Sequence, residues 1–423
     1  MAITDPLLLP PDVLLVPVGE LSDEVRRQLR CDEGDFAVTR PRARTPSRII
    51  DAQAAELLRE FEKPVTLVEA VLRFARARGA DPETTLEEAF PFLEKLVAGG
   101  FLVNEGAAGA DGIEPSLLGG GSTDARNACD GWEVVAPLQV LDDTEIYQVR
   151  RNGQVAALKL ERPGGPRPGV AALLANEAAI LSVLGAERGK IAPRLLEQGE
   201  HEGRPYLAIE WCSGVDAESA ARELRGSGGA SESSDREGLR GLCQAIAAAY
   251  SRLHERGVVH GDVHPRNILV DAAGGVRLID LGLSRQIASA APATARGGVG
   301  FFFEPEFAAA QRAGLPAPPA GFASEQYAVA ALLYNLTTGT HYRDFSLERE
   351  EMLRQIAEEP PLPFAERGVA PWPALEAVLG RALAKAPEER FPDLKALAAA
   401  LARAEDPEGV PRGAAARRSP PAQ

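Results

Sequence analysis

The chain has 423 residues, of which 45% are hydrophobic and 25% are charged, and it carries a formal net charge of −15 at pH 7. This length and apolar content predict two or three domains with buried cores. The negative charge argues against nucleic acid and acidic membrane surfaces as general partners. Four scattered cysteines without a CxxC pair predict neither a zinc site nor a disulfide framework.

The apolar start of the chain carries no basic leader and is interrupted by prolines and an aspartate, so we do not expect a signal peptide. No apolar run is long enough to predict a membrane-spanning helix. The cytoplasm is therefore the expected location.

The first hundred residues predict a compact module of short strands and three helices. Thr66 with Glu69 forms a capping-box signature, and Gly79 ends that helix. Asp81 then supplies an N-cap, with a proline at the first position of the next helix. The expected elements are strands at 12–18 and 35–39, helices at 52–61, 66–78 and 81–98, and a strand at 101–103.

The sequence runs IIDAQAAELL, TLVEAV and FLEKLVAGGFLV give residues 1–104 a winged-helix-like pattern. The pattern resembles the leader-peptide recognition domains of ribosomally synthesised peptide pathways. The resemblance implies that a substrate leader binds as an added strand on an exposed sheet edge. A winged helix for DNA or protein contact is the alternative. Only residues 40–48 are arginine-rich, which argues against DNA.

Three segments read as connectors rather than as parts of a core. Residues 105–130 are rich in Gly, Ala and Ser and predict a flexible tether. Residues 227–235 predict a disordered insertion. Residues 405–423 predict a disordered tail.

A lysine lies inside the apolar strand pattern of residues 155–160, where an unpaired charge is unfavourable. This residue is Lys159. A partner is available in the helical pattern of residues 170–184, where Glu177 is flanked by leucines and isoleucines. Farther along, residues 205–213 predict a strand that runs into a connector.

The segment HGDVHPRNILVD places Asp262 and Asn267 on a loop between a helix at 238–257 and a hairpin. Asp280 follows the second strand of that hairpin, so the three side chains are expected near one point. Phosphoryl transfer from ATP needs such a set. One carboxylate orients the attacking hydroxyl and accepts its proton, while an amide and a carboxylate hold magnesium.

These motifs resemble the catalytic loop and metal-binding motif of the protein-kinase superfamily, over about residues 133–404. The resemblance implies an α+β fold with an N-lobe at 131–211 and a C-lobe at 212–404, behind the module. It implies that Lys159 contacts the ATP phosphates, that Asp262 is the catalytic base, and that Asn267 and Asp280 bind Mg²⁺. The nucleotide contacts that it further implies are Ala157 against adenine, the backbone of Glu210 and Cys212 at the adenine edge, Asp216 at the ribose, and Leu269.

Downstream motifs favour the eukaryotic-like Ser/Thr branch over small-molecule kinases of the aminoglycoside type, which share the HGD-x-H-x-x-N loop. Glu306 stands where the family has a buried glutamate, and Arg390 matches its arginine partner. Residues 324–339 resemble the central helix of the large lobe, and the last helices are expected at 375–384 and 394–402.

The chain also departs from the family pattern. The phosphate-covering turn at 140–145 has no glycine and three acidic residues, which would repel a polyphosphate. Gly261 replaces an arginine that pairs with a phosphorylated activation loop, so we expect activity without such phosphorylation. His264 replaces a phosphate-contacting lysine, and Glu325 replaces an aspartate.

The remaining histidines carry no metal-ligand spacing. His260 is expected to pack beneath Asp280. His201, His254 and His341 are expected to be loop or surface residues.

The sequence therefore predicts an ATP- and Mg²⁺-dependent kinase that phosphorylates Ser or Thr on a protein or peptide. One form of this hypothesis is a precursor peptide bound by the N-terminal module, as in lanthipeptide-type dehydration, with lyase and cyclase steps left to partner proteins. The alternatives are a signalling kinase whose module binds a regulator, and a catalytically silent scaffold.

Overall fold

The computed structural model describes residues 5–21, 26, 32–43, 47–107, 115–117, 128–162, 169–185, 191–226, 233–288, 300–346 and 348–405. By its internal contacts the chain divides into two compact units, residues 1–175 with 195–211 and residues 176–194 with 212–423. Residues 227–232 of the predicted insertion and 406–423 of the predicted tail lie outside the described residues, whereas residues 233–235, also predicted as disordered, begin helix α7 (Ser233–Glu255). None of the helices in the described ranges is long and apolar enough to cross a membrane.

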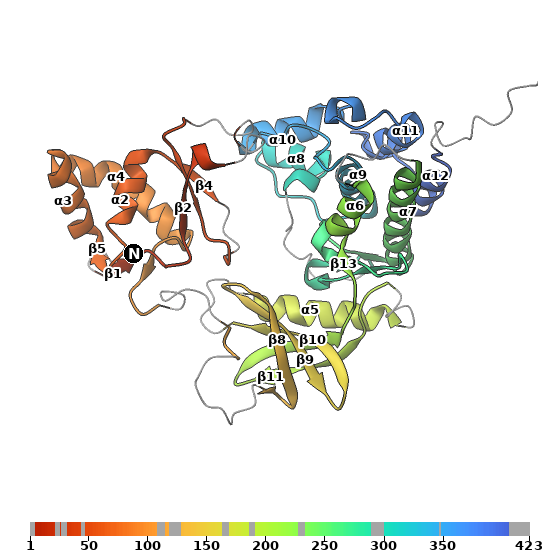
Figure 1. The fold of residues 1–423 in the computed structure, drawn as a ribbon, viewed down its shortest axis with the longest axis horizontal. Coiled ribbons are helices and arrows are strands. Elements are labelled where there is room, and N and C mark those ends of the chain that lie inside the picture. Colours follow the sequence, from red (N-terminus) through yellow and green to blue (C-terminus); the bar gives the residue numbers. More distant parts are fainter. Residues whose placement is uncertain are drawn as a thin grey trace, which may run out of the picture. The chain divides into compact units, whose positions relative to one another are not determined.

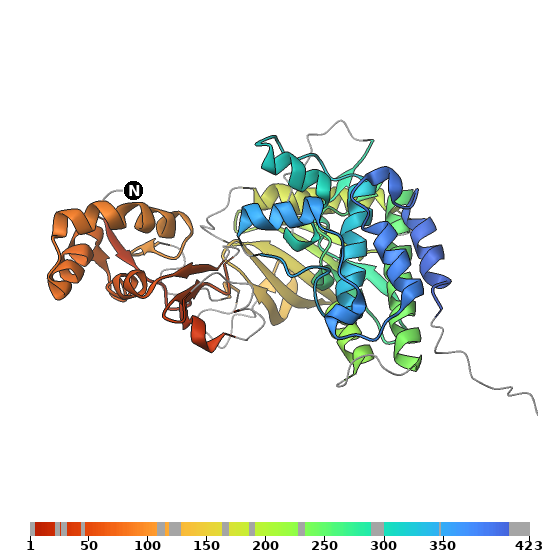
Figure 2. The same ribbon diagram turned by 90° about the horizontal axis from the view of Figure 1, so that it is seen from above.

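Within its described residues, the N-terminal module has two small antiparallel sheets and the helices α2, α3 and α4 (Figures 1 and 2). One sheet has the order β5-β1-β6 and the other the order β2-β3-β4. Side chains from both sheets and from all three helices form one apolar core. The elements are β1 (Pro6–Leu8), β2 (Leu14–Pro17), η1 (Val18–Glu20), β3 (Phe36–Thr39), β4 (Arg48–Ile50), α2 (Ala52–Arg59), β5 (Val65–Thr66), α3 (Leu67–Arg78), α4 (Pro82–Ala98) and β6 (Val103–Asn104).

The local signals of the sequence are found at the predicted helix ends. The Thr66 side chain accepts a hydrogen bond from Glu69 N at 3.3 Å, and Asp81 accepts one from Thr84 N at 2.8 Å. Gly79 ends α3 in the left-handed conformation, with φ 64°. In the arginine-rich segment, Arg40 is 5% exposed because its guanidinium contacts Asp12 and the Gly100 carbonyl. That arginine therefore supports the fold of the module.

The N-lobe consists of an antiparallel sheet of six strands in the order β11-β12-β10-β9-β8-β7. Large side chains on one face, including Trp132 and Tyr147, form its core. The first strand begins inside the segment predicted as a tether. The strands are β7 (Ala128–Cys129), β8 (Trp132–Val140), β9 (Thr144–Arg151), β10 (Gln154–Glu161), β11 (Leu195–His201) and β12 (Arg204–Glu210), and helix α5 covers Val170–Val183.

The second unit is mainly helical, and α9 is almost entirely buried within it (Figure 1). Helix α9 begins at Phe322, two residues before the predicted start, because Ser324 hydrogen-bonds back to Gly321. The helices are α6 (Ala217–Arg225), α7 (Ser233–Glu255), α8 (Pro305–Arg312), α9 (Phe322–Thr338), α10 (Arg349–Glu358), α11 (Pro373–Ala382) and α12 (Leu394–Ala402). The short strands are β13 (Val215–Asp216), β14 (Val258–Val259), β15 (Ile268–Val270), β16 (Val276–Leu278) and β17 (Arg285–Gln286).

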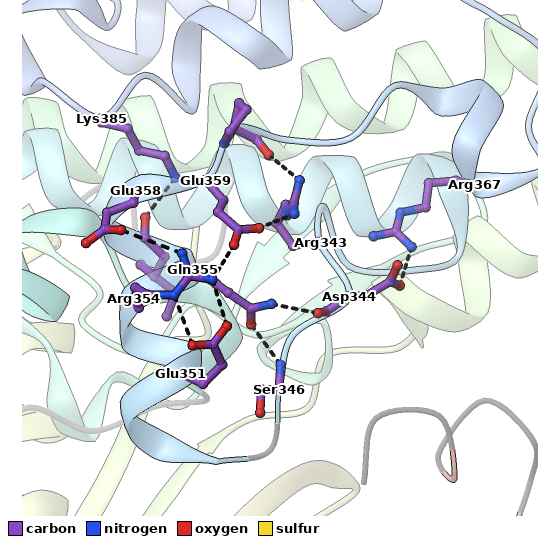
Figure 3. A network of polar contacts seen from close by, with 12 residues as sticks. Arg343, Asp344, Ser346, Glu351, Arg354, Gln355, Glu358, Glu359, Arg367 and Lys385 are labelled. Atoms are coloured by element: carbon purple, nitrogen blue, oxygen red, sulfur yellow. Dashed lines mark hydrogen bonds and ion pairs between the residues drawn. The ribbon is translucent and has the colours of Figure 1, made fainter. Parts of the chain in front are cut away.

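A polar network holds α10 against the segments around it (Figure 3). Gln355 on α10 donates to the Asp344 carbonyl at 3.0 Å and accepts from Ser346 N at 2.8 Å. Arg354 binds Glu351 through two hydrogen bonds of 2.9 and 2.7 Å. The network fixes the helix to the chain that follows α9.

Candidate active site

Lys159 and Ala157 lie on the same face of β10, because successive side chains of a strand point to opposite faces. The side chains that alternate with them along the strand, Ala156, Leu158 and Leu160, belong to the core of the N-lobe. Lys159 therefore lies on the face opposite that core, and it is only 8% exposed. Glu210 ends β12 and pairs with Ala156 of β10.

In the second unit, Asp262 and Asn267 are directly hydrogen-bonded to each other. The Asn267 amide nitrogen donates to the Asp262 carboxylate oxygen Oδ2 at 2.9 Å and to the Asp262 carbonyl at 3.1 Å. Both partners can only accept, so the nitrogen must be the atom that faces them. The Asn267 side-chain oxygen consequently points away from Asp262 and can serve as a metal ligand.

Asp280 follows β16 and lies next to this pair. The Ile279 N–H donates to the Asn267 carbonyl at 2.9 Å, which joins the two loops. Asp280 has φ 63°, a left-handed conformation that is uncommon for a residue with a side chain. Such backbone strain is typical of functional positions. The unit thus places Asp280 one residue from a backbone contact with Asn267, which in turn is hydrogen-bonded to Asp262.

Helix α5 contributes two neighbouring side chains to the loop after Asp280. Glu177 is 1% exposed, and its carboxylate accepts from Leu281 N at 3.4 Å. The Asn176 amide donates to the carbonyls of Gly282 and Ser284 at 2.9 and 2.8 Å. Sequence analysis did not single out Asn176, because its partners lie more than a hundred residues away.

His260 is fully buried and connects the loop of Asp262 with the loop of Asp280. Its Nε2 lies 3.0 Å from the Ile279 carbonyl, which can only accept, so Nε2 carries the proton. Its Nδ1 accepts from Asp262 N at 3.3 Å. The predicted structural role of His260 therefore includes a direct contact with the backbone of the proposed catalytic base.

Glu325 supports the same loop from α9. One carboxylate oxygen accepts from Gly261 N at 2.9 Å, and the other lies 2.7 Å from His254 Nε2. Burial acts to raise the pKa of Glu325, but the hydrogen bonds and the His254 charge outweigh it and lower this pKa below 4.5. A lowered pKa favours the ionised form in the fold. The stabilisation is complete above pH 4.5 and is lost as the pH falls through the folded-state pKa.

The expected loop or surface position is wrong for His254, which lies on helix α7, whereas His341 lies in the loop after α9 as expected. The His254 side chain is 9% exposed because it pairs with Glu325. His341 packs against Phe301 and Phe302, with ring centroids 4.5 and 5.7 Å away, and burial lowers its pKa to about 4. Both residues are half-buried in the second unit.

His264 begins the short η3 helix (Pro265–Asn267) that carries Asn267. Its Nδ1 accepts from Arg266 N at 3.2 Å, so the neutral ring carries its proton on Nε2. Burial lowers the pKa of His264, which favours this neutral form. The ring also contacts Phe302 edge-on, with a centroid distance of 6.0 Å.

Asp216 acts as the N-cap of α6. Its carboxylate accepts from Ser219 N at 3.0 Å and from Ser219 Oγ at 2.8 Å. Burial acts to raise the pKa of Asp216, but these bonds outweigh it and lower the pKa. Asp216 also pairs with Leu269 across β13 and β15, while the Arg277 guanidinium donates to Cys212 Sγ at 3.6 Å.

The acidic turn between β8 and β9 is less repulsive than its sequence implied. The turn is closed by a hydrogen bond from Leu141 N to the Thr144 carbonyl at 2.8 Å. Asp143 is 3% exposed and accepts from Thr144 Oγ1 at 2.9 Å, and Glu145 is fully buried. These two carboxylates are therefore occupied within the protein.

The predicted pair of Glu306 and Arg390 is formed by two hydrogen bonds of 2.9 and 2.7 Å. The expected burial of Glu306 is wrong, because its side chain is 31% exposed while that of Arg390 is fully buried. Glu304, two residues earlier, is the buried glutamate, at 2% exposure.

A protein kinase domain model matches residues 145–392, which is more than half of the chain. The chain belongs to the protein kinase family. The chain is 29% identical over 204 residues to a "probable serine/threonine-protein kinase" of Corynebacterium efficiens, covering 47% of this chain and 29% of that one. It is 32% identical over 151 residues to serine/threonine-protein kinase PknD of Mycobacterium tuberculosis, covering 36% and 22%.

The chain therefore spans less than a third of the length of these curated relatives. Among solved structures, a mutant of the PknI kinase domain of Mycobacterium tuberculosis is 21% identical to this chain over the matched part. It matches with a TM-score of 0.45, covering 67% of this chain and 99% of that one.

Gly261 occupies a position at which the loop of this chain leaves room only for glycine. Its φ is 78°, and an added Cβ would lie 2.5 Å from the Leu283 carbonyl oxygen. The arginine common at this position in the family cannot be accommodated without moving the loop.

Gly261→Ala is therefore expected to destabilise the kinase domain more than Gly257→Ala. Gly257 has a similar φ of 71°, but an added Cβ there meets nothing within 4 Å among the described residues. Left-handed strain of about 1–2 kcal/mol is common to both variants, and the clash is added only at position 261. Urea unfolding measures the difference, and equal losses of stability would contradict this geometry.

Proposed function

We propose that the chain transfers the γ-phosphate of ATP to a Ser or Thr hydroxyl of a protein or peptide. The observation that carries the proposal is the hydrogen-bonded pair of Asp262 and Asn267, with Asp280 on the adjoining loop. Membership of the protein kinase family implies ATP and a divalent metal. The names of the relatives, which are serine/threonine-protein kinases, support Ser and Thr as acceptors.

Asn267 and Asp280 suit Mg²⁺, because this ion prefers oxygen ligands and is commonly held by one or two side chains together with phosphates and water. The Asn267 oxygen is turned away from Asp262 and is available for such a bond. When bound, the metal neutralises negative charge on the phosphates during transfer.

Asp262 acts as the base. Its Oδ2 is held by Asn267, and no hydrogen bond to Oδ1 is found within the described part of the chain, so Oδ1 is assigned to the acceptor hydroxyl. The hydroxyl proton passes to Asp262 as the acceptor oxygen bonds to the γ-phosphorus. The bond from that phosphorus to the β-phosphate oxygen breaks, and ADP leaves.

The other predicted residues are proposed to bind and orient ATP. Lys159, oriented by Glu177, would contact the phosphates, and Ala157 would lie against the adenine. We assign the remaining contacts to the backbone of Glu210 and Cys212 at the adenine edge and to Leu269. Asp216 would reach the ribose only with a carboxylate lone pair that is not used in capping α6. His264 would donate from Nε2 to the γ-phosphate.

Asp262→Asn is expected to reduce kcat by about 10²–10⁴-fold, because the amide cannot accept the proton. ATP binding should change little, since the metal ligands remain. Transfer of labelled γ-phosphate from ATP to a generic protein acceptor measures the effect. Asp271→Asn is the control, because Asp271 only caps the hairpin turn by accepting from Ala273 N and Gly275 N. Equal rates for Asp262→Asn and the native protein would refute the assignment, and no transfer by the native protein would favour the scaffold.

We further propose that the acceptor is a precursor peptide whose leader binds to the N-terminal module. A groove of about 430 Å³ lies beside β4, the edge strand of the β2-β3-β4 sheet. An edge strand offers backbone groups to an added strand. The groove is lined by Ile49, Ile50, Asp51, Gln53, Ala54, Leu57, Phe74, Thr85, Glu88, Ala89 and Phe92.

The residues that line the groove indicate which side chains a bound leader would present. Most of these side chains are apolar, and the two charged ones, Asp51 and Glu88, are acidic. The groove therefore suits an extended segment that presents apolar side chains and a basic residue. A regulator that binds the same groove is the alternative.

Ala89→Trp is expected to fill the groove and to raise the KM of a leader-bearing peptide at least about tenfold, as expected when a buried contact is lost. Ala77→Trp is the matched control, because Ala77 is exposed on α3 and does not line the groove. The same acceptor peptide without its leader should be unaffected by either change. Equal KM values for the two variants would exclude leader binding here and leave the regulator as the occupant.

A further inference from the structure

The carboxylate of Glu145 is fully buried in the N-lobe, and four donors converge on it. Arg162 donates at 2.8 Å and the Tyr147 hydroxyl at 2.8 Å. The other two donors come from Ser116, whose backbone N–H lies 3.1 Å from Oε1 and whose hydroxyl donates to Oε2. All the acceptor positions of this carboxylate are thus occupied, half of them by a residue from the segment predicted as a flexible tether.

Residues 115–117, here called the linker clamp, also make contacts beyond Glu145. Leu117 N donates to the Tyr147 hydroxyl oxygen at 3.2 Å, and the Leu117 side chain packs against the N-lobe core. Arg204 donates to Ser116 Oγ at 2.8 Å. Burial raises the pKa of Tyr147 to about 12, so its hydroxyl keeps the proton that it donates to Glu145.

These contacts form a specific binding site for the linker clamp rather than a chance surface contact. A buried carboxylate that loses two of its donors retains its desolvation penalty without the compensating bonds. The two consecutive amides, of Ser116 and Leu117, both find acceptors on the N-lobe. The hydrogen bonding of the buried Glu145 carboxylate in the N-lobe is therefore complete only when this part of the linker is bound.

The site lies at the base of the turn that covers the phosphates in protein kinases. Glu145 is the second residue of β9, and it pairs with Val140 of β8 on one side and with Leu160 of β10 on the other. Leu160 directly follows Lys159. Through Glu145 the linker clamp therefore contacts β9 directly, and β9 pairs with β8, which carries the other side of the turn, and with β10, which carries Lys159.

We propose that Glu145 is a positioning residue that docks the linker clamp onto the N-lobe, and that this docking orders the phosphate-covering turn for nucleotide binding. The turn has no glycine, so its backbone cannot adapt to the phosphates as a glycine-rich loop does. We infer that the docked linker clamp, which lies outside the sheet, instead holds the turn in one conformation. The effect on ATP rests on the proposed kinase function, whereas the docking itself does not.

Hydrogen exchange on the full-length, nucleotide-free protein tests the docking directly. The amides of Ser116 and Leu117 are expected to exchange at least about tenfold more slowly than in an unstructured chain, because both are hydrogen-bonded. In Glu145→Ala the protection of Ser116 should be lost, because the variant removes the acceptor of its N–H. Tyr147→Phe should remove the protection of Leu117, whose acceptor is the hydroxyl. Unprotected amides in the native protein would overturn the proposal without reference to any activity.

Calorimetry with ATP and Mg²⁺ tests the consequence for the turn. Glu145→Ala is expected to raise the Kd for ATP by roughly threefold to tenfold, as one or two lost hydrogen bonds would. Glu133→Ala is the matched control, because Glu133 is an exposed carboxylate on the neighbouring strand β8. An unchanged Kd in Glu145→Ala, with the amide protection lost, would overturn the role in nucleotide binding. Absence of ATP binding by the native protein would count against the proposed function and leave the exchange result to decide the docking.

Discussion

The arrangement of the second unit depends on the buried carboxylate of Glu325. It accepts the Gly261 N–H, the amide directly before Asp262, and it pairs with His254 at the end of α7. Helix α9 is buried along almost its whole length, so this carboxylate is held in a rigid frame. A buried ion pair does little for stability by itself, but removal of one partner leaves an uncompensated charge. The role of Glu325 is therefore to fix the catalytic loop, more than to stabilise the fold.

The loop that Glu325 holds is joined to its neighbours by a short chain of hydrogen bonds. His260 bridges the backbone of Asp262 and Ile279, and the Ile279 N–H reaches the Asn267 carbonyl. Asp280 follows in a left-handed conformation that these contacts maintain. The side chains proposed to act on ATP and its metal are thus carried by two loops that are already hydrogen-bonded to each other. Such preorganisation is the main source of catalysis in phosphoryl transfer, because the protein performs little covalent chemistry.

Features that depend on neighbours in the sequence were predictable, and features that depend on distant partners were not. Thr66 and Asp81 cap their helices as predicted, because a cap needs only the next three residues. The HGD loop and its hairpin were recognisable because the motif has a fixed spacing. The burial of His254 could not be read from the sequence, since its partner lies 71 positions away. The docking of Ser116 also depends on distant partners. The Gly- and Ala-rich composition of the linker does not reveal that a buried acceptor, Glu145, lies in the following domain.

The rate of phosphoryl transfer by Glu325→Gln and Glu325→Ala tests most directly whether this carboxylate fixes the catalytic loop. The glutamine keeps an acceptor for the Gly261 N–H, and kcat is expected to fall less than about tenfold, as one altered hydrogen bond allows. The alanine leaves both Gly261 and His254 without a partner, and kcat is expected to fall by about a hundredfold or more, while the Kd for ATP changes little. An alanine variant that folds and transfers phosphate as fast as the glutamine variant would show that the loop is held by other contacts.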